Sequence, residues 1–527
     1  MPMNQQEGNT LSVGQLMDQA NGTFPSGTTK YEKRGIAVMV PEWQIEHCIQ
    51  CNQCASICPH AAIRPVLLTK EEMEKSDVPA KPALGAKDLY FRIAVSPMDC
   101  QGCRNCIDAC PAKEKALVAK PLDTQRHLAD AWNYFMEDVT PKKNPMNKYT
   151  LKGSQFEKPL LEFSGACAGC GETPYAKLVT QLFGDRMMIA NASGCSSIWG
   201  GSAPSMPYTK NAAGHGPTWA NSLFEDNAEY GLGMHLGTQA CRKQITDIMT
   251  GLIEEGQIST ELKNAMEDWI CHRDEGEGSR ERADRLTDLL EKEKAGNETL
   301  EHLYENKIYF VKRSQWVFGG DGWAYDIGYG GVDHVLAMNR DVNILVFDTE
   351  VYSNTGGQSS KSTPTAAVAK FAASGKRTKK KDLGMMAMSY GYVYVAQINL
   401  GYDKNQAIKA IKEAEAYPGP SLIICYAPCI NHGIKRGMDH SFMEAKAAVE
   451  CGYWINYRYN PQLKAEGKKS FFLDSKAPTG DFEAFLRGEV RYASLEHEFP
   501  DVAKELFKKT KEDAMARRAL YERLDAE

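Results

Sequence analysis

The chain has 527 residues, of which 43% are hydrophobic and 25% are charged, and its formal net charge at pH 7 is −6. This length exceeds what one hydrophobic core usually organises, so we expect two or three domains. The small net charge gives no argument for a nucleic-acid partner, and the sequence shows neither a membrane-spanning apolar stretch nor a secretory leader. We therefore expect a cytoplasmic protein.

The first 22 residues differ in composition from the rest of the chain. They are rich in Gln, Asn and Gly and show little hydrophobic periodicity. This composition predicts a tail or linker over residues 1–22.

Eight cysteines in residues 23–145 form two copies of the pattern C-x2-C-x2-C-x3-C-P. This spacing is typical of proteins that bind two cubane [4Fe-4S] clusters. The alternatives are a zinc site and a disulfide framework, but zinc sites rarely use runs of four cysteines and a chain this long needs no disulfides. The pattern predicts a small α+β dicluster ferredoxin-like domain with a connector at its end. Its ligands are Cys48, Cys51, Cys54, Cys58, Cys100, Cys103, Cys106 and Cys110.

The fourth cysteine of each run is expected to bind the cluster of the other run. Three thiolates of a run surround one cluster, and the fourth, next to the proline, reaches the neighbouring one. One predicted ligand set is Cys48, Cys51, Cys54 and Cys110, and the other is Cys58, Cys100, Cys103 and Cys106.

Residues 146–527 change to short apolar runs that alternate with helical periodicity. This alternation predicts an α/β domain with a parallel sheet covered by helices. Residues 240–308 are highly charged and favour helix, which predicts a helical insertion outside the sheet. The predicted strands are 187–192, 316–319, 342–347, 392–398 and 421–425, and the predicted helices are 175–183, 331–338, 365–373 and 404–416.

Two of these predicted strands end in residues typical of a thiamine diphosphate site. One ends in Gly319-Gly320-Asp321-Gly322, and the next ends in a run from Asp348 to Asn354. A diphosphate held through Mg²⁺ needs hard oxygen ligands, which Asp321, Thr349 and the main-chain carbonyl of Val351 supply. Glycines let the backbone approach the phosphates. A G-D-G alone is equally typical of a strand-to-turn junction, but two halves that each close an apolar strand favour the cofactor.

Four further cysteines follow predicted strands or precede a predicted helix. Taken alone, Cys167 and Cys170 fit a redox pair, half a zinc site or chance. Cys195 and Cys429, however, each follow a strand, and loops after parallel strands line the sheet edge where ligands bind. A third [4Fe-4S] cluster on these four cysteines would lie beside the thiamine, although spacing does not decide this.

Several stretches together resemble one known family. They are residues 22–25, 31–35, 167–172, 320–323 and 349–357. On these motifs the chain resembles the C-terminal half of pyruvate:ferredoxin (flavodoxin) oxidoreductase across nearly its whole length. The resemblance implies that Cys167, Cys170, Cys195 and Cys429 bind a proximal cluster, which gives three [4Fe-4S] clusters with thiamine diphosphate and Mg²⁺.

The resemblance also implies which residues contact the thiamine. They are Glu172, Cys195, Gly320, Asp321, Gly322, Trp323, Thr349, Glu350, Val351, Tyr352, Ser353 and Asn354. On residue type alone, Glu172 fits a surface or capping carboxylate equally well. Asn354 is the residue that we expect to reach the reacting substrate, with a turn asparagine as the alternative.

The implied activity is oxidative decarboxylation of pyruvate with coenzyme A to acetyl-CoA and CO2, with electrons passed to ferredoxin or flavodoxin. The family's N-terminal half, which carries the pyrimidine side of the thiamine site and the coenzyme A site, has no counterpart in these residues. We therefore expect this chain to be either one subunit of a split enzyme or a truncated product of a longer one. The expected partner is a chain that supplies the N-terminal half, in a homodimer or heterotetramer. The alternatives are an oxidoreductase for another 2-oxoacid and a purely electron-transferring iron-sulfur subunit.

A basic run of Lys376, Arg377, Lys379, Lys380 and Lys381 has two interpretations. Such a field can steer an acidic ferredoxin to the protein. A solvated loop is the simpler expectation, as it is for most charge runs.

Overall fold

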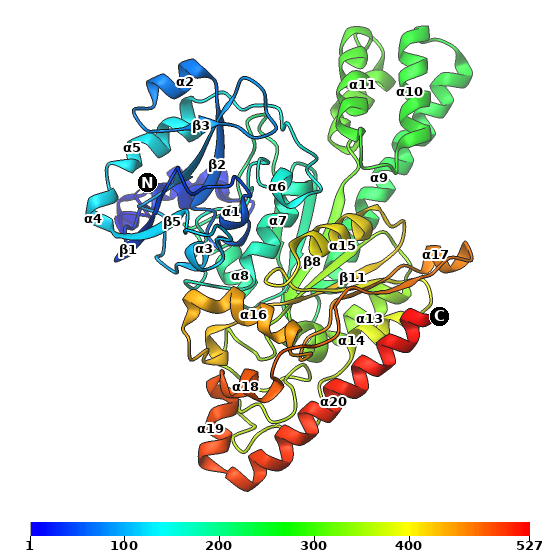
Figure 1. Cartoon of the computed structure of the whole chain (residues 1–527). Coiled ribbons are helices and arrows are strands. Elements are labelled where there is room, and N and C mark those ends of the chain that lie inside the picture. Colours follow the sequence, from blue (N-terminus) through cyan, green and yellow to red (C-terminus); the bar gives the residue numbers. More distant parts are fainter. Residues whose placement is uncertain (1) are drawn as a thin grey trace.

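The computed structural model describes residues 2–527, which form a small antiparallel region followed by a large α/β region (Figure 1). In the small region, β1 (Met39–Trp43) pairs with β5 (Leu117–Pro121), and β2 (Ile63–Leu68), β4 (Tyr90–Val95) and β3 (Lys81–Pro82) form a three-stranded sheet in that order. Its helices are α1 (Gln53–Ile57), α2 (Lys70–Lys75), α3 (Asn105–Asp108), α4 (Leu122–Gln125), α5 (Leu128–Asn133) and α6 (Leu151–Ser154). This region is the predicted α+β unit.

The two cysteine runs fold into loops of matching backbone geometry. Asn52 and Arg104, which directly precede α1 and α3, both adopt a left-handed conformation, with φ of 62° and 61°. Gln50 and Gly102 also have positive φ. The backbone N–H of each donates to the sulfur of the cysteine two residues earlier, at 3.4 Å. The sequence repeat therefore becomes a structural repeat that aims N–H groups at sulfur.

An eight-stranded, mostly parallel sheet organises the large region, in the order β13-β12-β10-β11-β9-β8-β6-β7. Its parallel strands are β6 (Met187–Asn191), β7 (Thr218–Asn221), β8 (Ser314–Gly320), β9 (Asn343–Asp348), β10 (Tyr394–Ile398) and β11 (Ser421–Tyr426). The antiparallel β12 (Tyr457–Tyr459) and β13 (Phe471–Leu473) extend one edge. Together with the small region before it, this sheet confirms the predicted fold class.

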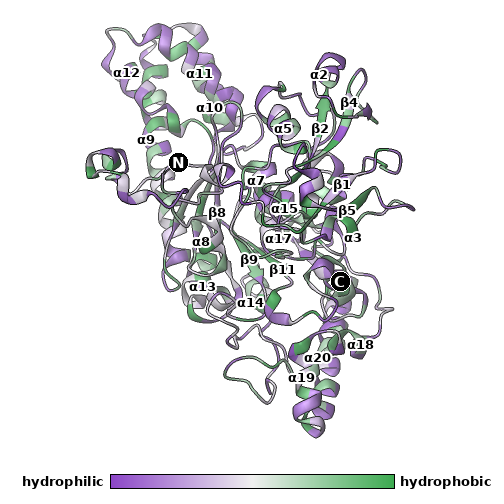
Figure 2. Ribbon diagram, turned by 90° about the vertical axis from the view of Figure 1, so that its left-hand side faces the viewer, coloured by the Kyte–Doolittle hydropathy of each residue, from purple (hydrophilic) through white to green (hydrophobic). Residues whose placement is uncertain are grey.

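Helices cover both faces of this sheet. Alternate residues of β9 enter different cores: Ile344 and Val346 pack on one face, and Leu345 and Phe347 on the other. The central strands are accordingly apolar along their length, as Figure 2 shows for β9 and β11. The helices of this region, apart from α10–α12, are α7 (Thr173–Phe183), α8 (Cys195–Gly200), α9 (Asn227–Glu255), α13 (Tyr329–Ala337), α14 (Leu383–Met388), α15 (Lys404–Ala416), α16 (Ser441–Glu450), α17 (Pro461–Ala465), α18 (Phe482–Arg487), α19 (Val490–Glu498) and α20 (Pro500–Ala526).

A helical excursion separates β7 from β8 in the chain. The second half of α9 packs with α10 (Thr260–His272), α11 (Ser279–Glu293) and α12 (Glu298–Glu305) around a separate core that includes Met266, Trp269 and Leu286. Figure 1 shows α10 and α11 projecting away from the sheet, whereas the first part of α9 packs on it. No helix among residues 2–527 is both long and apolar enough to span a membrane.

One predicted helix is wrong. Residues 365–373 form turns and isolated bridges, with Ala366 and Phe371 at φ of 72° and 68°. The backbone N–H of Val368 donates to the carbonyl of Arg491, and that of Ala366 to Lys376. Long-range backbone hydrogen bonds therefore replace the helical ones that the alanine-rich sequence favours.

Candidate functional site: an oxygen cluster beside three groups of thiols

The carboxyl ends of four neighbouring parallel strands place the predicted site residues along one edge of the sheet. The β8 strand pairs with β6 and β9, and β9 pairs with β11 up to the register Tyr426↔Asp348. The residues just past these strands are Cys195 at the start of α8, Asp321 after β8, Thr349 after β9 and Cys429 after β11. The order of strands in the sheet therefore gathers segments that are far apart in the sequence.

Three oxygens converge at the predicted magnesium position. The Thr349 hydroxyl lies 2.9 Å from Oδ1 of Asp321 and 3.1 Å from the Val351 carbonyl oxygen. Asp321 is fully buried, and burial, reinforced by the nearby Asp348, raises its pKa to about 7. A divalent cation would offset this cost of a buried carboxylate, so the donor set fits Mg²⁺.

Two serines that sequence reasoning did not identify hold the other oxygen of Asp321. Ser360 and Ser362 donate to its Oδ2 at 2.7 and 3.0 Å. They fix the carboxylate so that Oδ1 faces Thr349. No motif marks these serines, because the loop that carries them returns to the site from beyond the recognised pattern.

The two glycines of the G-D-G motif differ in their surroundings. A Cβ on Gly322 would lie 2.4 Å from the ring of Tyr352, so this position requires glycine. Gly320 ends β8, whereas Trp323 is 1% exposed and belongs to the core. Asn354 is exposed on the loop after β9, and its predicted role at the substrate stays a prediction.

Glu350 points away from the oxygen cluster. Its carboxylate accepts hydrogen bonds from Lys380 at 2.9 Å, Tyr453 at 2.5 Å and Arg491 at 2.8 Å. Its backbone is left-handed, with φ of 62°, between the two residues whose oxygens converge with Asp321. Glu350 therefore holds the loop rather than meeting the cation.

The four scattered cysteines come together next to this loop. The pKa of Cys429 is raised to about 12, first by burial and then by negative charge that includes Glu172, Cys195 and Cys167. Burial and nearby negative charge also raise the pKa values of Cys170 and Cys195. The Cys195 sulfur lies 3.2 Å from the Ser353 hydroxyl, which links the thiol group to the loop after β9.

Glu172 lies among these thiols and is buried. Its carboxylate accepts a hydrogen bond from the indole N–H of Trp199 at 2.7 Å, and burial raises its pKa to about 7. The structure therefore places Glu172 between the thiol group and the core, and its predicted contact with thiamine stays a prediction.

The eight cysteines of the small region form two crossed groups. The thiols that raise the pKa of Cys54, after burial, are Cys51, Cys48 and Cys110. Those that act on Cys106 most strongly are Cys103, Cys58 and Cys100. Each group thus contains three cysteines of one run and the last cysteine of the other, which is the arrangement that the spacing predicts.

Asn105 connects the second of these groups to the scattered cysteines. Its side-chain amide donates to the Met438 carbonyl at 2.9 Å and to the Ser441 hydroxyl at 3.1 Å, and Ser441 donates to the carbonyl of Gly169. Gly169 lies between Cys167 and Cys170, and its N–H also meets the Cys103 thiol. The group with Cys103 therefore lies between the scattered group and the group with Cys54.

Among the described residues, no three His, Cys, Asp or Glu side chains converge as they would on a single metal ion. A [4Fe-4S] cube separates its four thiolates around its corners, so it does not require such convergence. Backbone N–H groups also reach Cys110, Cys170 and Cys429, at 3.4 to 3.5 Å.

Family models match both regions. The thiamine pyrophosphate enzyme C-terminal TPP-binding domain matches residues 307–425, and the 4Fe-4S dicluster domain matches residues 47–113. A domain of unknown function matches residues 1–37. These matches support thiamine and iron-sulfur binding in the regions where the oxygens and thiols gather.

Curated relatives match the chain from end to end. The pyruvate-flavodoxin oxidoreductase of Klebsiella pneumoniae is 65% identical over 100% of this chain and 45% of its own length. The pyruvate:ferredoxin oxidoreductase of Moorella thermoacetica is 57% identical over 99% of this chain and 45% of its own length. The chain is therefore similar, over nearly its whole length, to part of pyruvate:ferredoxin (flavodoxin) oxidoreductases. It spans less than half the length of these relatives.

The basic run of residues 376–381 is not a solvated loop throughout. Lys380 pairs with Asp348 at 2.7 Å and with Glu350 at 2.9 Å, and it is largely buried. Lys376 donates to the carbonyls of Ser360 and Thr363. These lysines therefore support the loops around the oxygen cluster, which leaves less of the run for docking an electron carrier.

Proposed function

We propose that this chain is the thiamine diphosphate and iron-sulfur portion of a pyruvate:ferredoxin (flavodoxin) oxidoreductase, which converts pyruvate and coenzyme A to acetyl-CoA and CO2. The observation that carries the proposal is the contact between Cys195 and Ser353, because it joins a four-thiol group to the loop of the oxygen cluster. Carbon chemistry and electron acceptance would then occur side by side.

In this proposal Asp321, Thr349 and Val351 hold Mg²⁺, and Mg²⁺ holds the diphosphate. Bound thiamine supplies the carbon centre that adds to the keto group of the substrate. Ser360 and Ser362 keep the Asp321 carboxylate oriented, and Glu350 keeps the Thr349 and Val351 oxygens turned toward it. Asn354, exposed on the same loop, is placed to contact the substrate.

Three [4Fe-4S] clusters would carry the electrons outward. The order follows from the Asn105 bridge: the cluster of Cys167, Cys170, Cys195 and Cys429 comes first, that of Cys58, Cys100, Cys103 and Cys106 second, and that of Cys48, Cys51, Cys54 and Cys110 last. Ferredoxin or flavodoxin would then accept the electrons, as the names of the relatives indicate.

The relatives extend well beyond the region matched here, so residues from that part are proposed to complete the thiamine and coenzyme A sites. Either another part of the polypeptide or a partner chain can supply them. We place the assembled protein in the cytoplasm, because cluster thiolates need a reducing compartment.

The test is performed on anaerobically purified chain. We expect about twelve irons per chain, as three four-iron clusters require, and thiamine diphosphate binding that depends on Mg²⁺. Asp321→Ala should abolish that binding without changing the iron content. An iron content of about eight per chain would contradict the presence of a third cluster. Thiamine diphosphate binding that does not need Mg²⁺, or full binding by Asp321→Ala, would contradict the proposed cofactor site.

A further inference from the structure

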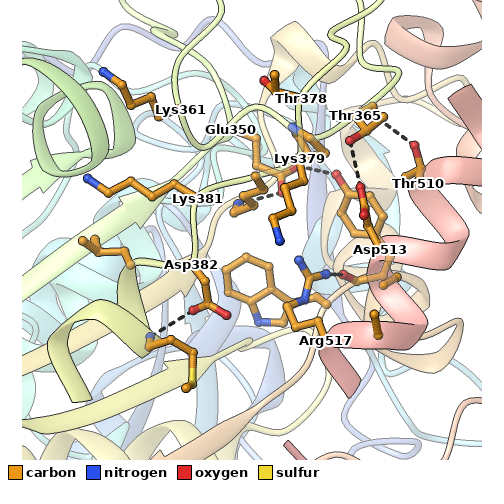
Figure 3. A pocket seen from close by; sticks show the side chains of 18 of the residues that line it. Glu350, Lys361, Thr365, Thr378, Lys379, Lys381, Asp382, Thr510, Asp513 and Arg517 are labelled. Atoms are coloured by element: carbon orange, nitrogen blue, oxygen red, sulfur yellow. Dashed lines mark hydrogen bonds and ion pairs between the residues drawn. The ribbon is translucent and has the colours of Figure 1, made fainter. Parts of the chain in front are cut away.

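A cavity of about 730 Å³ lies behind the loop after β9, between residues 360–382 and the C-terminal helix α20. Of the predicted cofactor residues, Glu350 alone lines it, through the side chain that points away from the oxygen cluster. Figure 3 shows Lys379 entering this space from the loop and Arg517 entering it from α20. Asp321, Thr349 and Val351 do not line the cavity, although Ser360, which donates to Asp321, lies in its wall.

The cavity is strongly cationic although the whole chain is acidic. Its cationic lining includes Lys361, Lys376, Lys379, Lys380, Lys381 and Arg517. Its carboxylates are Glu350, Asp382 and Asp513. A concave surface with an excess of one charge concentrates the electric field and attracts ligands of the opposite charge.

Several of the lysines are already engaged within the protein. Lys380 pairs with Glu350 and Asp348, Lys361 pairs with Asp326, and Lys381 donates to the carbonyl of Tyr325. Lys379 makes no hydrogen bond or ion pair with another of residues 2–527. It is the ammonium group that remains available to a ligand.

Arg517 and Trp454 present donors that the described residues do not satisfy. One guanidinium nitrogen of Arg517 donates to the Tyr453 carbonyl at 2.9 Å, but its Nε is buried without a hydrogen-bond partner. The indole Nε1 of Trp454, a residue only 3% exposed, is also buried without one. Buried donors are costly unless they are paired, so an acceptor at this position would stabilise the protein.

Charge repulsion among the lysines of the cavity lining also favours a bound anion. Burial, followed by repulsion from Lys380, lowers the pKa of Lys376 to about 8. Burial, followed by repulsion from Lys361, lowers that of Lys381 to about 8. A bound anion would relieve this repulsion.

We propose that this cavity binds a phosphorylated ligand of nucleotide size, whose phosphate oxygens lie between Lys379 and Arg517 and whose ring accepts a hydrogen bond from the indole N–H of Trp454. A guanidinium binds phosphate through two parallel hydrogen bonds, and an ammonium adds a compact charge. The volume falls in the range of pockets for small organic ligands. The proposal does not depend on the proposed oxidoreductase activity.

Calorimetric titration of the full, iron-loaded chain with ADP tests the proposal, without Mg²⁺ or thiamine diphosphate. Inorganic pyrophosphate serves as a second probe that lacks the ring. The variants are Lys379→Gln, Arg517→Gln and the double substitution. The matched control is Lys508→Gln, which removes an exposed lysine of α20 that does not line the cavity.

We expect saturable ADP binding that weakens at least about tenfold in the double variant, as loss of two charge-assisted contacts implies. Pyrophosphate should bind more weakly than ADP, and Lys508→Gln should bind ADP as the unmodified chain does. Because Lys379 is exposed, its substitution should leave folding intact, so Lys379→Gln alone keeps the test valid if Arg517→Gln unfolds.

Two outcomes would overturn the proposal. One is the absence of ADP and pyrophosphate binding at millimolar concentration. The other is binding that persists in Lys379→Gln and the double variant but is lost in Asp321→Ala, which would place the anion at the candidate magnesium site. Because Mg²⁺-dependent thiamine binding is measured separately, this result is distinguishable from failure of the proposed function.

Discussion

The carboxylate of Glu350 and the guanidinium of Arg491 form a buried ion pair with an N–O distance of 2.8 Å, at 1% and 2% side-chain exposure. Burial by itself would raise the pKa of Glu350, but Lys380 and Arg491 outweigh it and lower the pKa to about 2. The pair thus fixes the side chain of Glu350, whose own backbone is left-handed. It anchors the loop that carries the Thr349 and Val351 oxygens.

Glu350→Gln should therefore destabilise the protein and weaken cofactor binding together. The substitution leaves Arg491 and Lys380 with less compensating charge in a buried position, which costs about 3–5 kcal/mol in comparable pairs. Thermal unfolding and Mg²⁺-dependent thiamine diphosphate binding measure the two effects. The control is Glu483→Gln, which breaks an exposed pair with Arg487 and should cost less than about 1 kcal/mol. Equal effects of the two variants would show that the buried pair does not anchor the loop.

Gly322→Ala should distort the site by steric overlap alone. The added methyl group would lie 2.4 Å from the Tyr352 ring, so that ring and its loop must move. We expect a loss of about 1–3 kcal/mol in stability, as for other overpacked sites, and weaker thiamine binding. Gly330→Ala in α13 is the control, because nothing lies within 4 Å of its added Cβ. Retention of full thiamine affinity by Gly322→Ala would argue against the proposed role of this loop.

Asn105→Ala should loosen the small region from the large one. It removes the amide that donates to the carbonyl of half-buried Met438 and to the hydroxyl of buried Ser441, which itself donates to Gly169 between Cys167 and Cys170. Leaving these partners unpaired costs about 1–3 kcal/mol. Electron transfer between the clusters should also slow. Rapid reduction with freeze-quench spectroscopy measures its rate. An unchanged transfer rate would mean that Asn105 contributes to stability alone.

Glu444→Gln should stabilise the protein at neutral and alkaline pH. Burial, and then the charge of Glu489, raises the pKa of Glu444 to about 7 from its ordinary 4.5. Its ionised form is thus disfavoured in the folded state, so stability falls as the pH rises from 4.5 to 7 and then stays low. The variant should gain up to about 3 kcal/mol at pH 8 and little at pH 4.5.

Unfolding temperatures of the Glu444→Gln variant and the unmodified chain at pH 4.5, 6 and 8 check this prediction. Glu505→Gln, on the exposed face of α20, is the control and should show no pH-dependent difference. A gain that is the same at every pH would indicate a packing effect instead of a titration.

Local sequence predicted the elements whose hydrophobic pattern agrees with their final surroundings. The run 342–347 is apolar on both faces because β9 is buried between helices, and this apolar pattern predicts the strand. Residues 365–373 have an equally helical composition, yet distant backbone groups of Arg491 and Lys376 take their hydrogen bonds. The Arg491 carbonyl lies outside any window of local sequence that contains residues 365–373.

The basic run shows the same limit at the site. A cluster of lysines between residues 376 and 381 predicts a solvated surface, and charge patterning alone supports nothing more. Lys380 is nevertheless largely buried, because its ammonium pairs with the carboxylates of Asp348 at the end of β9 and of Glu350 on the loop that follows. Local sequence likewise does not predict the cavity that these lysines line, because α20, far along the chain, forms its other wall.

The sequence by itself predicted much of the chemistry of this protein: two four-cysteine runs, a G-D-G motif and a second oxygen-bearing loop. Spacing carries these predictions, because a cluster or a cation constrains residues that are close in the chain, whereas the four scattered cysteines followed only from the family resemblance. Only the tertiary structure decided which groups meet. The parallel strand order brings Cys195 to Ser353, and Glu350 turns from the cation toward Arg491, since long-range burial and charge pairing depend on the whole fold.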